Sequence, residues 1–387
     1  MPPSTETTLW IIAGESSGDA YGARLAMELR QLAPELVIRG MGGTAMGDSG
    51  VDIMVDSSNL GVVGFVEVFK HLPTFLRIFR QLVHRAARER PDCVVLIDYP
   101  GFNMRFAAKL HALGIRVVYY VSPQVWAWGK HRVRKLAQRV DKMLVIFPFE
   151  PEVFASTELD VEFVGHPLVE ILSDLKDGEL ERRSDVVALL PGSREGEVER
   201  LLPRMLDTAH WLQQREHGVQ FVIPLPSSSL LATADDIVRN YEKSNGLSLN
   251  ARIVVGETRR WLQEADAGLA ASGTVTVEAA IFGLPLVVVY RLNRITYWLA
   301  KMLVRVPYFT MVNVVVNDAV YPEFLQADVV PEKLGPALQS VMRGGPQRKR
   351  VETGMQKCVR ALGGHRDIGR RTAQAILDVV HCGRQEV

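Results

Sequence analysis

A turn at Ser272-Gly273-Thr274 has the residue types that bind a diphosphate. It follows an apolar run at 267–271 and precedes a short helical pattern. Gly273 allows close backbone approach, the two hydroxyl groups can donate hydrogen bonds, and a helix beginning near Thr274 directs free N–H groups and its positive dipole end toward the turn. The spacing predicts a phosphate-binding turn, and an ordinary strand-to-helix turn with a capping Ser is the alternative.

A second turn and a carboxylate complete what a nucleoside diphosphate requires. Gly192, Ser193 and Arg194 follow an apolar run at 186–190. The Arg194 guanidinium matches phosphate oxygens, and such a charge-assisted contact contributes about 1.5–3 kcal/mol. Glu278 lies one helical turn inside the helix that follows the first turn, where it can accept hydrogen bonds from a ribose diol. A solvated surface Glu is the alternative.

Asp98 is the candidate general base. It ends an apolar run that begins at Cys93 and precedes Tyr99-Pro100-Gly101, a turn that cannot continue the strand. A carboxylate with a reference pKa of about 3.9 is ionised at neutral pH and can take a proton from an attacking alcohol. The alternative is a carboxylate that caps the next turn or helix.

Two more small-residue turns occur in the first half of the chain. In the turn after the run 9–13, Ser17 can cap the next helix, Gly18 permits a close turn and Asp19 falls in the first helical turn. The second turn contains Gly43. Because the spacing is not G-x-G-x-x-G, a dinucleotide fingerprint is weakly supported, and both turns also fit a purely structural role.

Aromatic and basic residues follow the run 116–121. Trp126 and Trp128 precede a basic segment that includes Arg132. Such a segment can grip a sugar face or a headgroup phosphate, and a solvated basic helix is the alternative.

An apolar stripe at helical spacing runs beside a row of cations in the first half. Its apolar members include Phe65, Phe69, Leu72, Phe75, Leu76 and Phe79, and its cations include Arg77 and Arg80. The pattern is typical of an interfacial membrane helix and equally of a core helix with a solvated face. At roughly 1 kcal/mol per cation near an anionic leaflet, attachment would be reversible. Residues 292–309 repeat this chemistry.

Short apolar runs alternate with helical patterns along the chain, which predicts parallel α/β structure. The runs form two sets, divided by a charged segment at 173–185: 9–13, 37–41, 93–98, 116–121, 142–147 and 161–164, then 186–190, 220–224, 251–255, 267–271 and 286–290. We expect two Rossmann-like, doubly wound domains facing a cleft, with ligands at the carboxyl ends of the strands.

Composition and charge exclude several classes of protein. The 387 residues carry a net charge of +1, so no basic field indicates a nucleic-acid partner. Three widely spaced cysteines fit a reducing compartment and no metal cluster. The N-terminus has no signal-peptide pattern, and no apolar run reaches the roughly 18 residues of a spanning helix. We expect a cytoplasmic protein whose membrane contact is peripheral.

Ordered motifs over nearly the whole length resemble the lipid-A-disaccharide synthase family, glycosyltransferases of the two-domain GT-B type. The motifs are Gly14-Glu15-Ser16-Ser17-Gly18-Asp19, Gly42-Gly43, Gly64-Phe65-Val66-Glu67-Val68, Asp98-Tyr99-Pro100-Gly101-Phe102-Asn103, Ser122-Pro123-Gln124-Val125-Trp126-Ala127-Trp128, Gly165-His166-Pro167-Leu168, Pro191-Gly192-Ser193-Arg194, Ser272-Gly273-Thr274 with Glu278, and Pro322-Glu323-Phe324-Leu325-Gln326.

The resemblance implies a reaction of lipopolysaccharide synthesis in Gram-negative bacteria. UDP-2,3-diacylglucosamine would donate its sugar to 2,3-diacylglucosamine 1-phosphate, giving a β-1,6-linked disaccharide and UDP, at an anionic inner-membrane surface. Residues 1–170 would form an acceptor and membrane-facing domain, and residues 171–363 a donor domain. Because both substrates carry acyl chains, the apolar stripe and its cations, and the similar segment at 292–309, would face the bilayer. The last helix, within 364–387, would pack back on the first domain or on the partner subunit of a homodimer.

The resemblance also implies which residues bind each substrate. For the donor they are Gly192, Ser193, Arg194, Ser272, Gly273, Thr274, Glu278, Asn313, Glu323 and Gln326. For the acceptor they are Ser17, Gly18, Asp19, Gly43, Asn103, Gln124, Trp126 and Arg132. No D-x-D triple is present to hold a metal against the diphosphate, so neither a metal nor another cofactor is expected.

Both lines of reasoning predict an inverting transfer with two catalytic residues. Asp98 would activate the acceptor 6-hydroxyl for in-line attack, and Arg194 would stabilise the departing diphosphate. Two alternatives stay open: a UDP-N-acetylglucosamine epimerase on the same fold, which needs no lipid acceptor, and a non-catalytic protein that binds UDP-sugars or lipids.

Overall fold

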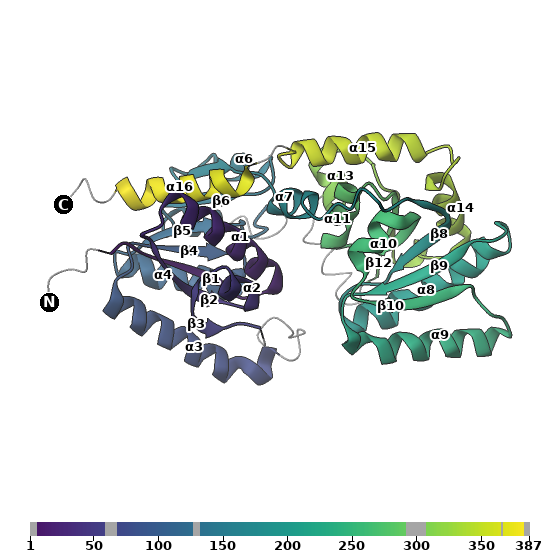
Figure 1. Ribbon diagram of the computed structural model, residues 1–387, viewed down its shortest axis with the longest axis horizontal. Helices are drawn as coiled ribbons and strands as arrows, with labels where there is room; N and C mark the ends of the chain where they lie inside the picture. The colour runs from purple at the N-terminus through teal and green to yellow at the C-terminus, as the bar shows by residue number, and fades with distance from the viewer. Residues whose placement is uncertain (1–5, 59–67, 127–131, 292–306, 365–366, 383–387) are drawn as a thin grey trace. The chain divides into compact units, whose positions relative to one another are not determined.

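The computed structural model describes residues 6–58, 68–126, 132–291, 307–364 and 367–382. The chain divides into two compact units, here called unit 1 (Met1–Glu170 with His365–Val387) and unit 2 (Ile171–Gly364). Each unit contains one parallel sheet with helices packed against it, as Figure 1 shows. The predicted α/β class with two doubly wound halves is confirmed.

The sheet of unit 1 has seven strands in the order β3-β2-β1-β4-β5-β6-β7. The strands are β1 (Thr8–Ala13), β2 (Val37–Gly42), β3 (Asp52–Asp56), β4 (Cys93–Ile97), β5 (Arg116–Tyr120), β6 (Lys142–Val145) and β7 (Asp160–Phe163). The helices are α1 (Ser16–Leu32), α2 (Thr44–Asp48), α3 (Val68–Glu89), α4 (Pro100–Ala112), α5 (Arg132–Ala137), α6 (Glu150–Phe154), α7 (Pro167–Ser173, which continues into unit 2) and α16 (Ile368–Cys382).

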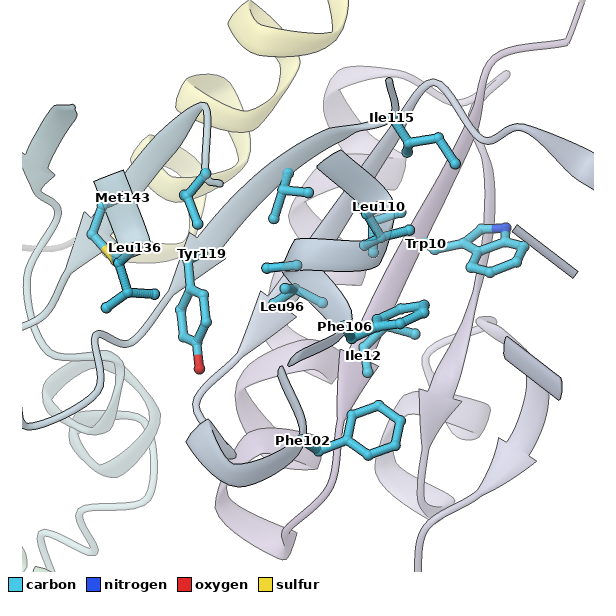
Figure 2. Packing of buried hydrophobic residues seen from close by; sticks show 14 of the residues in the cluster. Trp10, Ile12, Leu96, Phe102, Phe106, Leu110, Ile115, Tyr119, Leu136 and Met143 are labelled. Atoms are coloured by element: carbon cyan, nitrogen blue, oxygen red, sulfur yellow. The ribbon is translucent and has the colours of Figure 1, made fainter. Parts of the chain in front are cut away.

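Continuous apolar runs form the central strands of unit 1 because both faces of a parallel sheet are buried. All five residues of β4 are buried, and so are the last five of β1. Trp10, Leu96, Phe106 and Tyr119 belong to the core cluster shown in Figure 2, and each is fully buried. This core holds the carboxyl ends of β1, β4 and β5 in place.

The sheet of unit 2 has six strands in the order β10-β9-β8-β11-β12-β13. The strands are β8 (Arg183–Leu190), β9 (Gln220–Leu225), β10 (Ala251–Val255), β11 (Ala265–Ala271), β12 (Leu286–Tyr290) and β13 (Glu323–Leu325). The helices are α8 (Glu195–Gln213), α9 (Leu231–Asn245), α10 (Thr258–Glu264), α11 (Thr274–Phe282), α13 (Met311–Val316), α14 (Pro331–Val341) and α15 (Arg348–Ala361), with 3₁₀ turns η1 (Ser228–Leu230) and η2 (Gln326–Asp328).

All eleven predicted strands occur, and two strands were missed. β3 is half-exposed with charged ends, and β13 has only three residues, so neither shows an apolar run. Two predicted strands were one residue too long at functional positions. Asp98 and Val121 have φ of +45° and +66°, which takes the backbone out of the β region just after β4 and β5.

The C-terminal helix α16 packs against α1, within unit 1 (Figure 1). The Gly369 backbone N–H donates to Glu170 Oε2 at 2.8 Å, and Glu170 Oε1 accepts from Arg24 of α1 at 2.6 Å. Arg371 of α16 donates to the Val164 carbonyl. Hydrogen bonds therefore join the last helix of the chain to the rest of unit 1, although Val164 and Arg371 are 207 residues apart in the sequence.

Candidate functional site

In unit 1, two of the predicted turns leave the sheet side by side. β1 and β4 are neighbours, and Ala13 at the end of β1 pairs with Ile97 at the end of β4. The strand order reverses between these two strands, so this is the switch point at which doubly wound sheets bind ligands. The turn that begins at Gly14 therefore lies next to the turn that begins at Asp98.

Gly14 is required by this proximity. A Cβ atom at position 14 would lie 2.3 Å from the ring of Tyr99, far inside van der Waals contact. The ring in turn stacks on Phe102, with centroids 5.8 Å apart. The two turns can approach this closely because Gly14 has no side chain.

The turn at Asp98 is strained and firmly held. Asp98 and Tyr99 both have positive φ, +45° and +49°, which is uncommon for residues other than glycine and accumulates at functional sites. The Asp98 carbonyl accepts hydrogen bonds from the Tyr119 hydroxyl at 2.7 Å and from Asn103 Nδ2 at 2.8 Å. Tyr119 and Asn103 are completely buried, so the core itself stabilises the strained backbone.

Burial raises the pKa of Asp98 from its usual 3.8 to about 6, and the negative charge of Glu15 acts in the same direction. The sequence-based assumption of an ordinary carboxyl pKa was therefore wrong, because desolvation in the folded unit disfavours the charged form. A base with a pKa near 6 is still mostly ionised at neutral pH and accepts a proton more readily than an ordinary carboxylate.

In its predicted role as general base Asp98 must be deprotonated, so we expect kcat/KM to fall with decreasing pH through an apparent pKa of about 6. Glu15→Gln removes a negative charge that raises this pKa, so the acid limb should move to lower pH. A pH–rate profile measures the shift. Glu35→Gln is the matched control, since Glu35 is exposed beyond the far end of α1, about 25 Å away along the helix. Identical limbs for all three proteins would contradict the assignment.

Asp19 and Gly43, predicted to bind the acceptor, contact each other instead. The Asp19 carboxylate accepts from the backbone N–H groups of Gly43, Ala45 and Met46 at 2.6, 3.0 and 3.1 Å, so it caps the N-terminus of α2. A Cβ at position 43 would lie 2.8 Å from Asp19 Oδ2. These contacts give Asp19 a structural role, and the direct acceptor contact assigned to it stays a prediction.

Gly18 and Asn103, also predicted to bind the acceptor, pack inside the fold, and Ser17 is half-buried. Ser17 lies inside α1, whose N-cap residue is Glu15, so it is not the predicted cap. Gly18 packs against β1 and β4, where a Cβ would lie 3.3 Å from the Ala13 Cβ. Asn103 is completely buried and its Nδ2 donates to the Ile97 and Asp98 carbonyls, so it positions the Asp98 turn, and its predicted contact with the acceptor stays a prediction.

The remaining acceptor predictions lie beyond β5. Gln124 is exposed, Trp126 is half-buried against the Phe149 ring at 5.2 Å, and Arg132 begins α5. Trp128 lies outside the described residues. The structure therefore leaves Gln124 and Trp126 accessible at the carboxyl side of the sheet.

Glu150 is a buried carboxylate that sequence reasoning missed. It is 1% exposed and accepts hydrogen bonds from the Ile146 and Phe147 backbone N–H groups at 3.2 and 3.0 Å. Burial raises its pKa to about 7, and the charge of Asp98 contributes in the same direction. A carboxylate shortly after the apolar run 142–147 was the available signal.

In unit 2, the two predicted anion turns also leave neighbouring strands. Leu190 at the end of β8 is paired with Ala270, one residue before the end of β11, and the strand order reverses between these strands. The turn with Gly192 and Arg194 leads into α8, and the turn with Ser272 leads into α11. Neither helix has a side-chain hydrogen bond from its N-cap residue. Two helix N-termini thus flank the switch point of unit 2, an arrangement that favours an anion.

The turn at Ser272–Thr274 is open on one side. Gly273 has φ of 169°, an extended conformation available to any residue, and a Cβ placed on it would meet no atom within 4 Å. The Ser272 backbone N–H donates to the Val289 carbonyl at 3.1 Å. Backbone geometry therefore does not require a glycine here, and the space beside it is available to a ligand.

Glu278 is half-buried in α11. Burial raises the pKa of its carboxyl group, and the positive charge of Arg259 lowers it.

Asn313 and Glu323, predicted to bind the donor, form an internal network. Asn313 is fully buried and donates to the Tyr321 carbonyl at 2.9 Å and to Glu323 Oε1 at 2.8 Å. Glu323 also accepts from the backbone N–H groups of Phe309 and Thr310. Direct donor contact by Asn313 is corrected to a positioning role, because both amide protons are used. Gln326 follows β13 with φ of +50°.

The helix that carries the predicted membrane stripe is in large part a core helix. Phe79 packs against Phe102 and Phe106 with ring centroids 5.4 and 6.0 Å apart, and Phe75 lies 6.4 Å from Tyr99. The bilayer-facing prediction for Phe75 and Phe79 is corrected, because their rings face the protein. Exposed members are Leu76, Arg77 and Arg80; Phe65 and the side chains of Phe69 and Leu72 lie outside what is described, as do residues 292–306.

The described residues include neither a metal-binding cluster nor a membrane-spanning helix. Over these ranges, no group of three or more His, Cys, Asp or Glu side chains is placed to hold a metal ion. No helix in the same ranges is both long enough and apolar enough to cross a bilayer.

Comparison with known proteins identifies the family. A family model described as Lipid-A-disaccharide synthetase matches residues 9–379. The chain is 35% identical to the lipid-A-disaccharide synthase of Myxococcus xanthus, over 97% of this chain and 98% of the relative. It is 37% identical to that of Nitrosococcus oceani, over 88% and 89% of the two chains.

Solved structures of low identity share the fold. A UDP-GlcNAc 2-epimerase from Neisseria meningitidis bound to UDP-GlcNAc has a TM-score of 0.61 at 12% identity, over 96% of this chain and 100% of the other. MurG of Acinetobacter baumannii has a TM-score of 0.54 at 15% identity, over 96% and 99%. The epimerase likeness concerns the fold alone, whereas the sequence matches extend over nearly the full length, and the chain belongs to the lipid-A-disaccharide synthase family.

Proposed function

We propose that the chain is an inverting hexosyltransferase that joins 2,3-diacylglucosamine from UDP-2,3-diacylglucosamine to the 6-hydroxyl of 2,3-diacylglucosamine 1-phosphate. The observation that carries the proposal is the family match over residues 9–379. The products are a β-1,6-linked disaccharide 1-phosphate and UDP.

Unit 2 holds the donor in this proposal. The diphosphate lies against the turns at Gly192–Arg194 and 272–274, where the N-termini of α8 and α11 supply positive dipole ends. Arg194 is 78% exposed at its side chain and is thus accessible to phosphate oxygens. As the bond to the anomeric carbon breaks, negative charge grows on the diphosphate, and these groups stabilise it. Glu278 holds the ribose, and Glu323 supports the segment at 309–313.

Unit 1 holds the acceptor and the base in this proposal. Asp98 takes the proton of the 6-hydroxyl as its oxygen attacks the anomeric carbon from the side opposite the leaving diphosphate, which inverts the configuration. The strained, clamped turn and the pKa of about 6 support this assignment. Gln124 and Trp126 are the accessible candidates for contact with the acceptor.

Release of UDP from the two acylated sugars tests the function. We expect UDP to appear only when both substrates are present. A UDP-N-acetylglucosamine epimerase would act on its nucleotide sugar without the lipid acceptor, and a binding protein would release no UDP. UDP-N-acetylglucosamine alone is the control substrate, and its epimerisation by this chain would overturn the proposal.

Turnover is expected to survive metal removal. Arg194 and the two helix N-termini supply positive charge at the proposed diphosphate site, so the departing UDP is stabilised without a divalent cation. Initial rates measured in EDTA should stay within about twofold of rates in Mg²⁺. Loss of activity in EDTA that is restored by Mg²⁺ would contradict this expectation.

Peripheral membrane contact is proposed through the exposed part of α3. Leu76 is 46% exposed and directly precedes the exposed Arg77, and Arg80 lies one turn further along. We expect the triple variant Leu76→Ser, Arg77→Gln, Arg80→Gln to co-sediment less with anionic vesicles than the wild type, because it loses two cations and an apolar contact. Arg88→Gln is the control, being 70% exposed on the same helix and paired with Glu89. Unchanged sedimentation of the triple variant would contradict the proposal.

A further inference from the structure

One carboxylate, that of Glu197, occupies the turn at Gly192–Arg194. Glu197, in the first turn of α8, accepts a hydrogen bond from the Ser193 backbone N–H at 3.1 Å through Oε2. Its other oxygen, Oε1, lies 3.2 Å from Arg194 Nη1. Glu197 therefore contacts the Ser193 backbone N–H and the Arg194 guanidinium. These are the two groups that we propose bind the diphosphate of the UDP-sugar.

The shape of the turn is built around this carboxylate. Gly192 has φ of +116°, a conformation that side-chain-bearing residues rarely adopt. A Cβ at this position would lie 2.3 Å from Glu197 Oε2 and 2.8 Å from Glu197 Cβ. The Glu197 side chain is only 19% exposed, so it lies within the turn rather than extending into solvent.

We propose that Glu197 is an internal anion that occupies the diphosphate turn when the turn is empty and competes with UDP for it. This inference rests on the proposed donor site and adds a residue that acts on product release. When UDP binds, the Ser193 N–H and Arg194 exchange the carboxylate for phosphate oxygens. When the sugar has been transferred, Glu197 takes these groups back and speeds the departure of UDP.

The strengths of the contacts permit such an exchange. An exposed ion pair between residues three apart on a helix is weak, and Arg194 is mostly exposed. A diphosphate presents more acceptor oxygens and more charge to the same groups than one carboxylate does. The displaced carboxylate remains near the bound diphosphate, however, and like charges at close range oppose binding.

A purely structural role makes the opposite prediction. If Glu197 only braced the turn, as a Glu in a capping box does, then neutralising it would loosen the turn and weaken UDP binding. Glu197→Gln separates the two roles because the amide keeps the shape and can still accept from the Ser193 N–H. The variant lacks the negative charge that competes with phosphate.

The test is calorimetric binding of UDP to the full chain, together with the dissociation rate from stopped-flow displacement. We expect Glu197→Gln to bind UDP about tenfold more tightly, mainly through slower dissociation. Glu199→Gln makes the same change in net charge at an exposed position on the same helix and should leave affinity within about twofold. Ligand-free melting curves identify any variant that fails to fold, and Glu197→Ala provides a second charge-free side chain.

The outcomes separate this inference from the donor site itself. Equal or weaker UDP binding by Glu197→Gln would overturn the competition, and so would equal tightening by Glu199→Gln. If Arg194→Ala bound UDP as tightly as the wild type does, the proposed donor site itself would be wrong. Tighter binding confined to the Glu197 variants would establish the internal anion.

Discussion

Asp98→Asn is expected to lower kcat by about 10²–10⁴-fold, the usual contribution of a general base. The amide cannot take the proton of the acceptor hydroxyl, while its size and its hydrogen-bonding shape stay nearly the same. Binding of UDP, which we assign to unit 2, should be unchanged. Steady-state rates with both acylated sugars, and calorimetry with UDP, measure the two effects separately.

The same substitution should not destabilise the protein. Because the pKa of Asp98 is higher in the folded chain than the usual 3.8, its ionisation opposes folding, and the free energy of unfolding declines as pH rises from about 4 to about 6. Asn removes this cost and tolerates positive φ better than most residues. We expect a gain of about 1–3 kcal/mol in the free energy of unfolding above pH 6, detectable as a higher Tm.

Asp48→Asn is the matched control for both measurements. Asp48 is an exposed residue at the end of α2, so neither kcat nor Tm should change appreciably. Near-wild-type turnover by Asp98→Asn would show that another group is the base. Glu150, buried and sensitive to the charge of Asp98, would then be the residue to substitute next.

Arg194→Ala is expected to lower kcat/KM by about 10²–10³-fold, as removal of one group that stabilises transition-state charge does. The guanidinium meets phosphate oxygens with two parallel donors, so Arg194→Lys should restore only part of the loss. Since the proposed contact of Arg194 with the diphosphate exists in substrate and product alike, UDP binding should weaken as well. Stability should change little, because the Arg194 side chain is 78% exposed.

Arg204→Ala is the control for Arg194→Ala. Arg204 is on the same helix and pairs with Asp207 three residues later, as Arg194 pairs with Glu197. The two variants lose the same charge and the same kind of ion pair. A comparable loss of kcat/KM in both would mean that general electrostatics, rather than contact with the diphosphate, accounts for the effect.

Much of the fold was predictable from local pattern. Apolar runs bounded by turn residues predicted eleven strands because strands buried on both faces consist of continuous apolar residues. The strands β3 and β13 lack such runs and were missed. The turns with Asp98, Gly192–Arg194 and 272–274 were also predicted, since glycine and proline directly after an apolar run mark the end of a strand.

The partners of individual polar residues were not predictable. Asp19 and Asn313 were assigned to substrates from the motifs that contain them, and the fold uses the first to cap α2 and the second to hold Glu323. Tyr119 lies in an apolar run, so nothing in the sequence indicated a polar contact for it. In the fold its hydroxyl donates a hydrogen bond to the Asp98 carbonyl. Glu197 carried no capping-box signal, because the N-cap residue three positions before it is Arg194 rather than Ser or Thr.

By itself, the sequence determined the rhythm of strands and helices, the positions of the turns at strand ends and the family of the chain, because these depend on residues close in sequence. Only the tertiary structure placed Ala13 beside Ile97 and Leu190 beside Ala270, which brings the turns together at the two switch points. The tertiary structure also raised the pKa of Asp98 and placed the Glu197 carboxylate in the turn at Gly192–Arg194. The pKa and the pairing of strand ends arise from desolvation and from contacts between residues far apart in the chain, which local pattern does not contain.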